Sequence, residues 1–324
     1  MSRCFTGLKP TGPLQLGNYL GAIRPLVAGQ HTHQTIAAVV DLHALTVEHD
    51  PALLGARTRE YATALLAAGV DPSVTTLYLQ SRLPEHTELH YLLECVTGYG
   101  EAHRMIQFKE KSAGRDRVRL SLLTYPVLMA ADILLHDTGE VPVGDDQRQH
   151  VELTRDLAAR FNAAYGATFT LPRAVHPLTA ARVMDLADPT AKMGKTSASQ
   201  AGVLFVLDPP DVLRRKIARA VTDTGTEVRY DPAAKPGVSN LLEILAACTG
   251  DEPAVLATKF NRYSELKTAV ADAVVAELAP VRERYSELSR DPDTVARVLS
   301  EGSDRARTRA SATVVRARTA LGLT

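Results

Sequence analysis

Residues 35–40, with the sequence TIAAVV, form a continuous and largely apolar run rich in strand-forming side chains. A strand with one face in water alternates apolar and polar residues, whereas a continuous run is the mark of a strand buried on both faces. Strands of that kind belong to parallel sheets that carry helices on both sides. This run therefore predicts an α/β fold.

Strand and helix patterns alternate on both sides of this run, which favours a parallel sheet. Further strands are predicted at residues 3–8, 74–80 and 141–143, and helices at residues 17–30, 51–68 and 146–164. Pro25 should break or kink the first of these helices, because proline lacks the backbone donor that a helix interior needs. Residues 84–135 are predicted to be a mostly helical insertion.

A polar stretch divides the chain near Asp188. Residues 188–199 are rich in lysine, serine, threonine and glycine, which predicts a mobile loop. Everything beyond is predicted to be helical, with Asp208 as an N-cap and Pro209 as the first residue of a helix. We therefore expect one unit over residues 1–187 and a helical unit over residues 200–324.

Composition excludes several classes of protein. The 324 residues include 37 basic and 37 acidic side chains, so the net charge does not indicate a partner. The three cysteines lie far apart without a CxxC pair, which predicts no metal site and is compatible with a reducing cytoplasm. The sequence contains no apolar stretch of about 18 residues, so we expect no membrane span. The first residues do not resemble a secretory signal.

Residues 10–22, PTGPLQLGNYLGA, lie between the first strand and its helix. Gly17 and Gly21 carry no Cβ, so a nucleotide can approach the backbone, and the helix N-terminus presents unpaired N–H groups to phosphate. Asn18 adds an uncharged donor. A plain strand–turn–helix with packing glycines explains this segment equally well.

Residues 191–199, AKMGKTSAS, place Lys192 and Lys195 three apart among small residues. Such a loop can wrap a triphosphate and offset the charge that builds on a leaving group. Taken alone, the segment is also compatible with a solvated lysine loop.

Residues 125–161 contain two further features. Asp132 interrupts a strongly apolar stretch, so its carboxylate is either paired or placed to accept a hydrogen bond from a ligand. The sequence GDDQ at 144–147 follows a strand and opens a helix, where ligands bind in open parallel sheets. Asp145 and Asp146 are therefore candidates for ribose hydroxyls, although one of them could simply cap the helix.

In this order and spacing, the three segments resemble the class I aminoacyl-tRNA synthetases. LQLGN stands in the place of the HIGH signature, and KMGKT in that of the KMSKS signature. The segments DLHALT, QFKEKSAG, YPVLMAADILL and RYDPAAKPGVSNLL resemble the bacterial tryptophanyl-tRNA synthetases, and the likeness covers essentially the whole chain, more weakly after about residue 250. The resemblance implies a Rossmann-type nucleotide-binding domain with a helical insertion, and an all-helical C-terminal domain that binds the tRNA anticodon.

The resemblance also implies an activity. ATP, with Mg²⁺, would activate L-tryptophan to tryptophanyl-adenylate, and the 2′-hydroxyl of the terminal adenosine of tRNA(Trp) would then accept the amino acid. Family members are cytoplasmic homodimers in which tRNA spans both subunits. Positioning and charge stabilisation would do the catalytic work, without a covalent enzyme intermediate.

For tryptophan, the resemblance assigns Asp132 to the indole N–H, which is a donor only and needs an acceptor. Tyr125 and Gln147 resemble the groups that hold the ammonium and carboxylate, and His43 resembles a pocket-side histidine. Four residues would form the apolar walls of the pocket: Phe5, Met129, Val141 and Val143. All four are also compatible with ordinary packing in the protein core.

For ATP, the resemblance assigns catalytic roles to Gln15, Asn18, Lys192 and Lys195. Lys111 either reaches pyrophosphate or is a surface charge. The positions that match ATP-binding residues of the family are Lys9, Pro10, Thr11, Gly17, Asn18, Gly144, Asp145, Asp146, Val183, Lys192, Met193, Gly194, Lys195 and Thr196.

The chain departs from the family pattern at a few positions. Gln15 replaces the signature histidine, and Gly194 and Thr196 replace the KMSKS serines. Lys9 replaces a common glutamine, and its charge should favour anionic substrates over neutral tryptophan mimics. Because the chain also lacks tryptophan, we consider an auxiliary, inhibitor-tolerant isoform, with chance composition and a solvent-facing Lys9 as the alternatives.

Other readings of the sequence stay open at this stage. A tyrosyl-tRNA synthetase shares the fold, but Phe5 and Met129 offer no partner for a phenol hydroxyl. A HIGH-type nucleotidyltransferase without a tRNA role is a second alternative, but it would have no function for the helical C-terminal third. An inactive paralogue is a third alternative, but it would not need Asn18, Asp132 and both lysines. Two arginine-rich clusters could meet tRNA phosphates or could be solvated helix faces: Arg305, Arg307, Arg309, Arg316 and Arg318, and Arg214, Arg215, Lys216 and Arg219.

Overall fold

A five-stranded parallel sheet forms the centre of the molecule, in the strand order β3-β2-β1-β4-β5. The computed structural model describes residues 2–175, 183–194 and 200–323, without the side chains of Asp145 and Asp146. The four predicted strands are confirmed within two residues at each end, and a fifth strand joins them. Their bounds are β1 Arg3–Leu8, β2 Gln34–Val39, β3 Thr76–Leu79, β4 Glu140–Pro142 and β5 Arg173–Val175.

Helices fill most of the remaining chain. The predicted helix over residues 17–30 is a continuous helical run over residues 16–29, in which a π-helical turn lies between two α-helical stretches. The break expected at Pro25 does not occur, because Pro25 lies in the first turn of the second α-helical stretch, where a proline is tolerated. The bounds are α1 Leu16–Asn18, η1 Tyr19–Ile23, α2 Arg24–Gly29, α3 Asp41–Ala44, α4 Pro51–Ala67, η2 Gln80–Arg82, α5 Glu85–Glu94, α6 Tyr99–Arg104, α7 Ile106–Ser112, α8 Leu120–Leu134, α9 Asp145–Tyr165, η3 Gln200–Gly202, α10 Pro210–Ala218, α11 Pro236–Thr249, α12 Pro253–Ala257, α13 Tyr263–Arg290 and α14 Pro292–Ala320.

The two faces of the sheet carry two separate hydrophobic cores. Ala37 and Val39 of β2 point into a core built with α4 and the C-terminal helices α10, α11 and α13. Ile36 and Ala38 point into a second core built with α5, α8, α9 and α14. This alternation explains the continuous apolar run at residues 35–40, because every side chain of the strand is covered.

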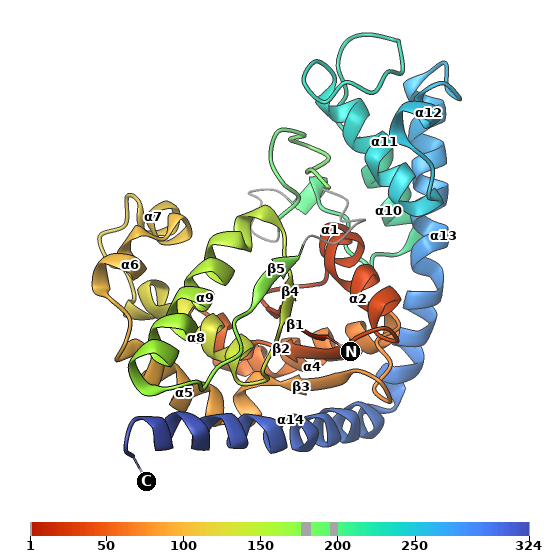
Figure 1. Cartoon of the computed structure of the whole chain (residues 1–324). Coiled ribbons are helices and arrows are strands. Elements are labelled where there is room, and N and C mark those ends of the chain that lie inside the picture. The colour runs from red at the N-terminus through yellow and green to blue at the C-terminus, as the bar shows by residue number, and fades with distance from the viewer. Residues whose placement is uncertain (1, 176–182, 195–199, 324) are drawn as a thin grey trace.

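The last helix, α14, returns to the sheet and runs along β3 and α5 (Figure 1). Gly302 permits this close approach, since a Cβ at this position would lie 1.8 Å from the carbonyl oxygen of Leu77. Arg316 and Arg318 pair with Asp137 and Glu88 of the sheet domain. The boundary near Asp188 stays a prediction, but α14 belongs by packing to the sheet domain, while α11 and α12 project away from it.

Two predictions for the C-terminal half are wrong. Residues 219–235 contain neither helix nor strand, so the region is not helical throughout. The helix predicted to begin at Pro209 begins at Pro210, with Pro209 as its N-cap residue. Asp208 has another task, because its carboxylate accepts hydrogen bonds from Lys216 Nζ at 2.7 Å and from the Phe205 amide at 3.2 Å.

Within the described ranges, the structure contains no helix whose length and apolar character would allow it to cross a membrane.

Candidate active site

The predicted site residues gather at the edge of the sheet where the strands end, which we call the carboxyl edge. Lys9 directly follows β1, His43 lies in α3 after β2, and Gly144 is the N-cap residue of α9 after β4. Because all strands are parallel, their carboxyl ends meet at one edge, where ligands of open α/β sheets bind. Pro10 is buried, Asn18 is half-buried, and Thr11 and Gly144 are exposed at this edge.

The two signature segments are joined by Gln15, although they lie 178 residues apart. Its Nε2 donates to the Met193 carbonyl at 2.9 Å, and its Oε1 accepts from the Gly17 amide at 2.6 Å. Glycine at residue 17 leaves room for this arrangement, since a Cβ would lie 2.8 Å from Gln15 Oε1 and would displace the Gln15 side chain. Both functional atoms of Gln15 are thus engaged inside the protein, and its donation to phosphate stays a prediction.

The described part of the KMGKT segment is anchored by its backbone. The Met193 amide donates to the Val183 carbonyl at 3.1 Å, and the Met193 side chain is buried. Lys192 lies beside Met184 in an isolated antiparallel bridge, with its side chain exposed. Gly194 is half-buried, and Lys195 and Thr196 lie outside the described residues.

Lys9 is half-buried at the end of β1 rather than directed into solvent. Its Nζ donates to Thr46 Oγ1 at 3.1 Å, so α3 and the turn after it hold the ammonium. Burial, and then repulsion from Lys111, lowers the pKa of Lys9 to about 8. Lys111 itself lies over the Tyr125 ring, 5.5 Å from the centroid, which brings the QFKEK segment to the same site.

Asp132 is almost fully buried, and three side chains donate to its carboxylate. Its Oδ1 accepts from Gln80 Nε2 at 2.6 Å and from His86 Nδ1 at 2.7 Å, and its Oδ2 accepts from His43 Nε2 at 2.8 Å. Burial raises the pKa of Asp132, but the hydrogen bonds from His43 and His86 outweigh it and hold the pKa well below the usual range. The carboxylate is therefore ionised and fixed in orientation.

A buried chain of polar groups continues behind Asp132. The Tyr78 hydroxyl lies between His86 Nε2 at 3.0 Å and His136 Nε2 at 2.8 Å. Burial lowers the pKa of His136 to about 3, so this histidine is neutral at physiological pH. Sequence analysis missed Gln80, His86, Tyr78 and His136, because each is a single polar residue without a recognisable spacing.

The expected apolar walls divide into two kinds. Phe5 and Val141 are buried in the core, and Phe5 stacks on His136 with ring centroids 5.9 Å apart. Met129 and Val143 are only half-buried, which leaves part of each side chain for a ligand. The role of all four in a tryptophan pocket stays a prediction.

Tyr125 and Gln147 approach the site from α8 and α9. The Tyr125 hydroxyl pairs with His150 Nε2 at 2.9 Å, and burial raises the pKa of Tyr125 to about 12. The Tyr125 ring also meets His43 edge-on, with centroids 6.2 Å apart. His43 is thus a structural link between Asp132 and Tyr125, and Gln147 is half-buried at the start of α9.

Comparison with known proteins places this arrangement in a family. The family model of the class I tRNA synthetases (W and Y) matches residues 1–279. Tryptophan–tRNA ligase 1 of Streptomyces coelicolor is 57% identical over 329 residues, which cover 100% of this chain and 98% of that protein. The chain belongs to the class I tRNA synthetases, in their bacterial tryptophanyl branch.

Solved structures of this family share the fold. Tryptophanyl-tRNA synthetase from Mycoplasma pneumoniae is 36% identical, with a TM-score of 0.93 and coverage of 100% of this chain and 98% of that chain. The Campylobacter jejuni synthetase, solved in complex with ADP and tryptophan, is 34% identical, with a TM-score of 0.84 and coverage of 99% and 100%. The predicted fold class and family are therefore confirmed.

Proposed function

We propose that this synthetase activates L-tryptophan with ATP and transfers it to the 2′-hydroxyl of the terminal adenosine of tRNA(Trp). The observation that carries the proposal is the joining of the two signature segments by Gln15, at the edge where the buried Asp132 carboxylate is held. A phosphate-binding helix start, a lysine segment and a fixed indole acceptor then belong to one site. The tryptophan carboxylate would attack the α-phosphate and release pyrophosphate, leaving tryptophanyl-adenylate.

Asp132 is the proposed selector for tryptophan. A carboxylate oxygen has two lone pairs, and Oδ2 receives one hydrogen bond, from His43. The second lone pair of Oδ2 would accept from the indole N–H, which can only donate. Because His43, His86 and Gln80 fix the carboxylate before a ligand enters, little ordering of Asp132 accompanies binding.

ATP is proposed to lie between the two signatures. Gly17 and Asn18 would admit the nucleotide to the start of α1, while Gly144 and the two aspartates after it would meet the ribose. Lys192 and Lys195 would act mainly in the transition state, as charge moves onto pyrophosphate. Mg²⁺ would enter with the phosphates as part of the substrate, sharing their charge.

The finer partner assignments are also proposals. The insertion between β3 and β4 exposes several large apolar side chains, and their exposure supports a homodimer that buries part of the insertion. These side chains are Tyr91, Tyr99, Ile106 and Leu120, from 56% to 72% exposed. In the C-terminal region, Arg215 on α10 and Arg219 directly after it are exposed and suit tRNA phosphates. The proposed location is the cytoplasm, where the enzyme would meet tRNA.

Lys9 supports the proposal of an inhibitor-tolerant isoform. Held by Thr46 rather than free to swing into solvent, its ammonium would face the anionic tryptophan carboxylate and α-phosphate. A neutral tryptophan mimic would gain nothing from this charge and would leave it poorly solvated.

One experiment tests the function directly: ATP–pyrophosphate exchange by the purified protein with tryptophan, with tyrosine or without an amino acid. We expect exchange that depends on tryptophan, with tyrosine at least 100-fold less effective, because Phe5 and Met129 offer no polar partner for a phenol hydroxyl. Tyrosine-dependent exchange would favour the tyrosyl reading. Exchange without any amino acid would favour a nucleotidyltransferase, and no exchange at all an inactive paralogue.

A further inference from the structure

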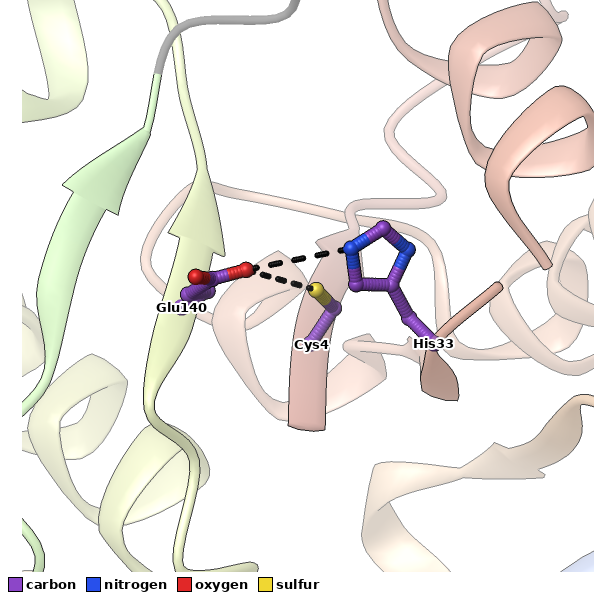
Figure 2. A group of neighbouring side chains, drawn as sticks. All are labelled: Cys4, His33 and Glu140. Atoms are coloured by element: carbon purple, nitrogen blue, oxygen red, sulfur yellow. Dashed lines mark hydrogen bonds and ion pairs between the residues drawn. The ribbon is translucent and has the colours of Figure 1, made fainter. Parts of the chain in front are cut away.

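Three potential metal ligands meet at the opposite, amino edge of the sheet, where the strands begin. Cys4 lies near the start of β1, His33 directly precedes β2, and Glu140 is the first residue of β4. Figure 2 shows the three side chains pointing toward one another from separate segments. Cys4 Sγ and His33 Nε2 each lie 3.9 Å from Glu140 Oε2, and all three ligand atoms lie within 4.8 Å of one another.

The other polar atoms of these side chains are already engaged. His33 Nδ1 lies 2.8 Å from Thr32 Oγ1 and 3.3 Å from the Gly29 carbonyl oxygen, which fits a ring that is protonated on Nδ1. Arg173 donates to Glu140 Oε1 at 2.5 Å, which leaves Oε2 toward the cluster. In protein metal sites, hydrogen bonds of this kind to the polar atom that does not bind the metal orient the ligand side chains.

We propose that Cys4 Sγ, His33 Nε2 and Glu140 Oε2 bind a zinc ion, with water or the Ser2 hydroxyl as the fourth ligand. Thiolate, imidazole and carboxylate are the three side-chain ligands that Zn²⁺ takes in proteins. A tetrahedral site with Zn–S of about 2.3 Å and Zn–N or Zn–O of about 2.0–2.2 Å places neighbouring ligand atoms about 3.5 Å apart. The two separations from Glu140 Oε2, 3.9 Å each, therefore need a contraction of roughly half an ångström. Cys4 Sγ and His33 Nε2 lie within 4.8 Å of each other, so this pair must approach by at most about 1.3 Å, through side-chain rotation.

The neighbouring charges allow a cation at this position. Arg173 is paired with Glu140, and the guanidinium of Arg3 is turned to the carbonyl oxygens of His136 and Asp137 and to the Gln34 side chain. Ser2 Oγ lies 3.1 Å from Glu140 Oε2, close enough to serve either as a ligand or as a hydrogen-bond donor to one. Zinc would displace the thiol proton of Cys4, as it does at other thiolate sites.

The proposed ion is structural rather than catalytic. It would join β1, β4 and the segment before β2 at the edge opposite the signatures, although Phe5 and Val141, which are assigned to the tryptophan pocket, directly follow Cys4 and Glu140 in the chain. Binding to the folded state alone raises stability by linkage, so zinc should raise the melting temperature of the whole chain. Tryptophan-dependent exchange should be unaffected at temperatures well below melting.

The test uses the full-length, chelator-treated protein with Co²⁺ as a spectroscopic probe and Zn²⁺ as competitor. We expect one Co²⁺ per chain, with a sulfur-to-cobalt charge-transfer band and visible bands of tetrahedral cobalt, all abolished by stoichiometric Zn²⁺. Cys4→Ser should remove the charge-transfer band, and His33→Gln and Glu140→Gln should weaken cobalt binding at least tenfold. Zinc should raise the melting temperature of the wild type but not of these variants.

The other two cysteines supply matched controls, because Cys95 is exposed and Cys248 is half-buried elsewhere in the molecule. Cys95→Ser and Cys248→Ser should keep the cobalt spectrum. The proposal is overturned if the wild type gives no sulfur-to-cobalt band, if Cys4→Ser keeps it, or if Cys95→Ser abolishes it. Should Cys4→Ser fail to fold, His33→Gln decides the outcome, since cobalt affinity equal to that of the wild type would exclude the site.

Discussion

The two edges of the sheet are built from the same strands but are encoded very differently. At the carboxyl edge, the functional residues come in short contiguous segments, such as residues 9–18, 144–147 and 191–196. At the amino edge, Cys4, His33 and Glu140 come singly from three separated places, and the first and the last are 136 positions apart in the sequence. The residues of the carboxyl edge can therefore be recognised in the sequence as motifs, whereas those of the amino edge form no recognisable pattern.

This difference has a physical origin. A nucleotide is bound largely by backbone N–H groups and by glycines that permit close approach, so several consecutive residues must cooperate. A metal ion needs one atom from each ligand, and any strand that starts nearby can supply it. The buried Asp132 at the carboxyl edge is also surrounded by single residues from separate elements. His43, His86 and Gln80 hold its carboxylate from three different helices.

The largest expected effect is that of Asp132→Asn. Both carboxylate oxygens accept hydrogen bonds, so the amide nitrogen of asparagine must face either His43 or the Gln80–His86 pair. We expect kcat/KM for tryptophan to fall about 5- to 150-fold, which corresponds to ~1–3 kcal/mol for a lost charge-assisted hydrogen bond. The measurement is tryptophan-dependent ATP–pyrophosphate exchange, with thermal unfolding in parallel.

Asp137→Asn is the matched control for this variant, because Asp137 is partly exposed and pairs with Arg316 rather than with the buried network. It should leave exchange within twofold of the wild type. An Asp132→Asn enzyme with unchanged kcat/KM would remove the carboxylate from the tryptophan pocket.

Gln15 tests the link between the two signatures. Gln15→Leu loses both hydrogen bonds and leaves the Met193 carbonyl and the Gly17 amide unpaired, at a cost of about 1–3 kcal/mol for each buried group. Gln15→Glu keeps an acceptor for Gly17 but loses the donor to Met193. We expect single-turnover adenylate formation to slow at least tenfold in Gln15→Leu, and tryptophan affinity to change less.

The glutamate variant decides which bond matters. If Gln15→Glu is as slow as Gln15→Leu, the bond to Met193 positions the lysine segment. Wild-type rates in both variants would mean that the joining of the signatures has no role in adenylation.

Lys9→Gln should have a moderate effect that depends on pH. The Lys9 pKa is lowered to about 8, so its positive charge is present below this pH and is lost as pH rises through it. At pH 7 the charge should contribute about 1 kcal/mol to tryptophan binding, or roughly a fivefold lower KM than in Lys9→Gln. The advantage should shrink by pH 9, and the glutamine variant should bind a neutral indole-bearing inhibitor more tightly than the parent does.

Lys9→Arg supplies the control, since its charge persists across this pH range. If Lys9→Gln is inhibited no more tightly than the wild type, or if the KM ratio is the same at pH 7 and pH 9, Lys9 does not select between anionic and neutral ligands.

The smallest effect is expected in α14. Arg316 pairs with Asp137 at the surface, so Arg316→Ala should cost about 0.2–1 kcal/mol of unfolding free energy and leave tRNA affinity unchanged. Arg215→Ala on α10 should instead weaken tRNA binding and reduce its salt dependence by about one phosphate contact. Equal effects of the two variants on tRNA binding would contradict this division of the arginine clusters.

Prediction from sequence succeeded where a pattern is local. The apolar run at residues 35–40 led to the parallel sheet, and the alternation of patterns around it led to the other three predicted strands. Prediction from sequence failed where an element depends on a contact with residues outside its own local pattern. Aspartate is a preferred capping residue, but the Asp208 carboxylate accepts hydrogen bonds from Lys216 and from the Phe205 amide instead. The helix therefore begins later, at Pro210.

The same limit applies to the candidate site. The signatures and Asp132 were found by their segments and by resemblance. Tyr78, His86 and His136 could not be found, because a lone buried histidine looks like any other until its partner is placed beside it. Sequence analysis also left the last arginine cluster as either a tRNA surface or a solvated face, and contacts with Asp137 and Glu88 fix α14 against the sheet domain instead.

The sequence by itself determined the α/β class and the positions of four of the five strands, and it singled out the segments proposed to bind the nucleotide, because burial on both faces and close backbone approach each leave a local mark. Only the tertiary structure decided that Gln15 holds Met193, that Asp132 is ionised within a ring of donors, and that Cys4, His33 and Glu140 converge at the amino edge. These arrangements depend on distances between side chains on different strands and helices, and such distances exist only once the sheet has formed.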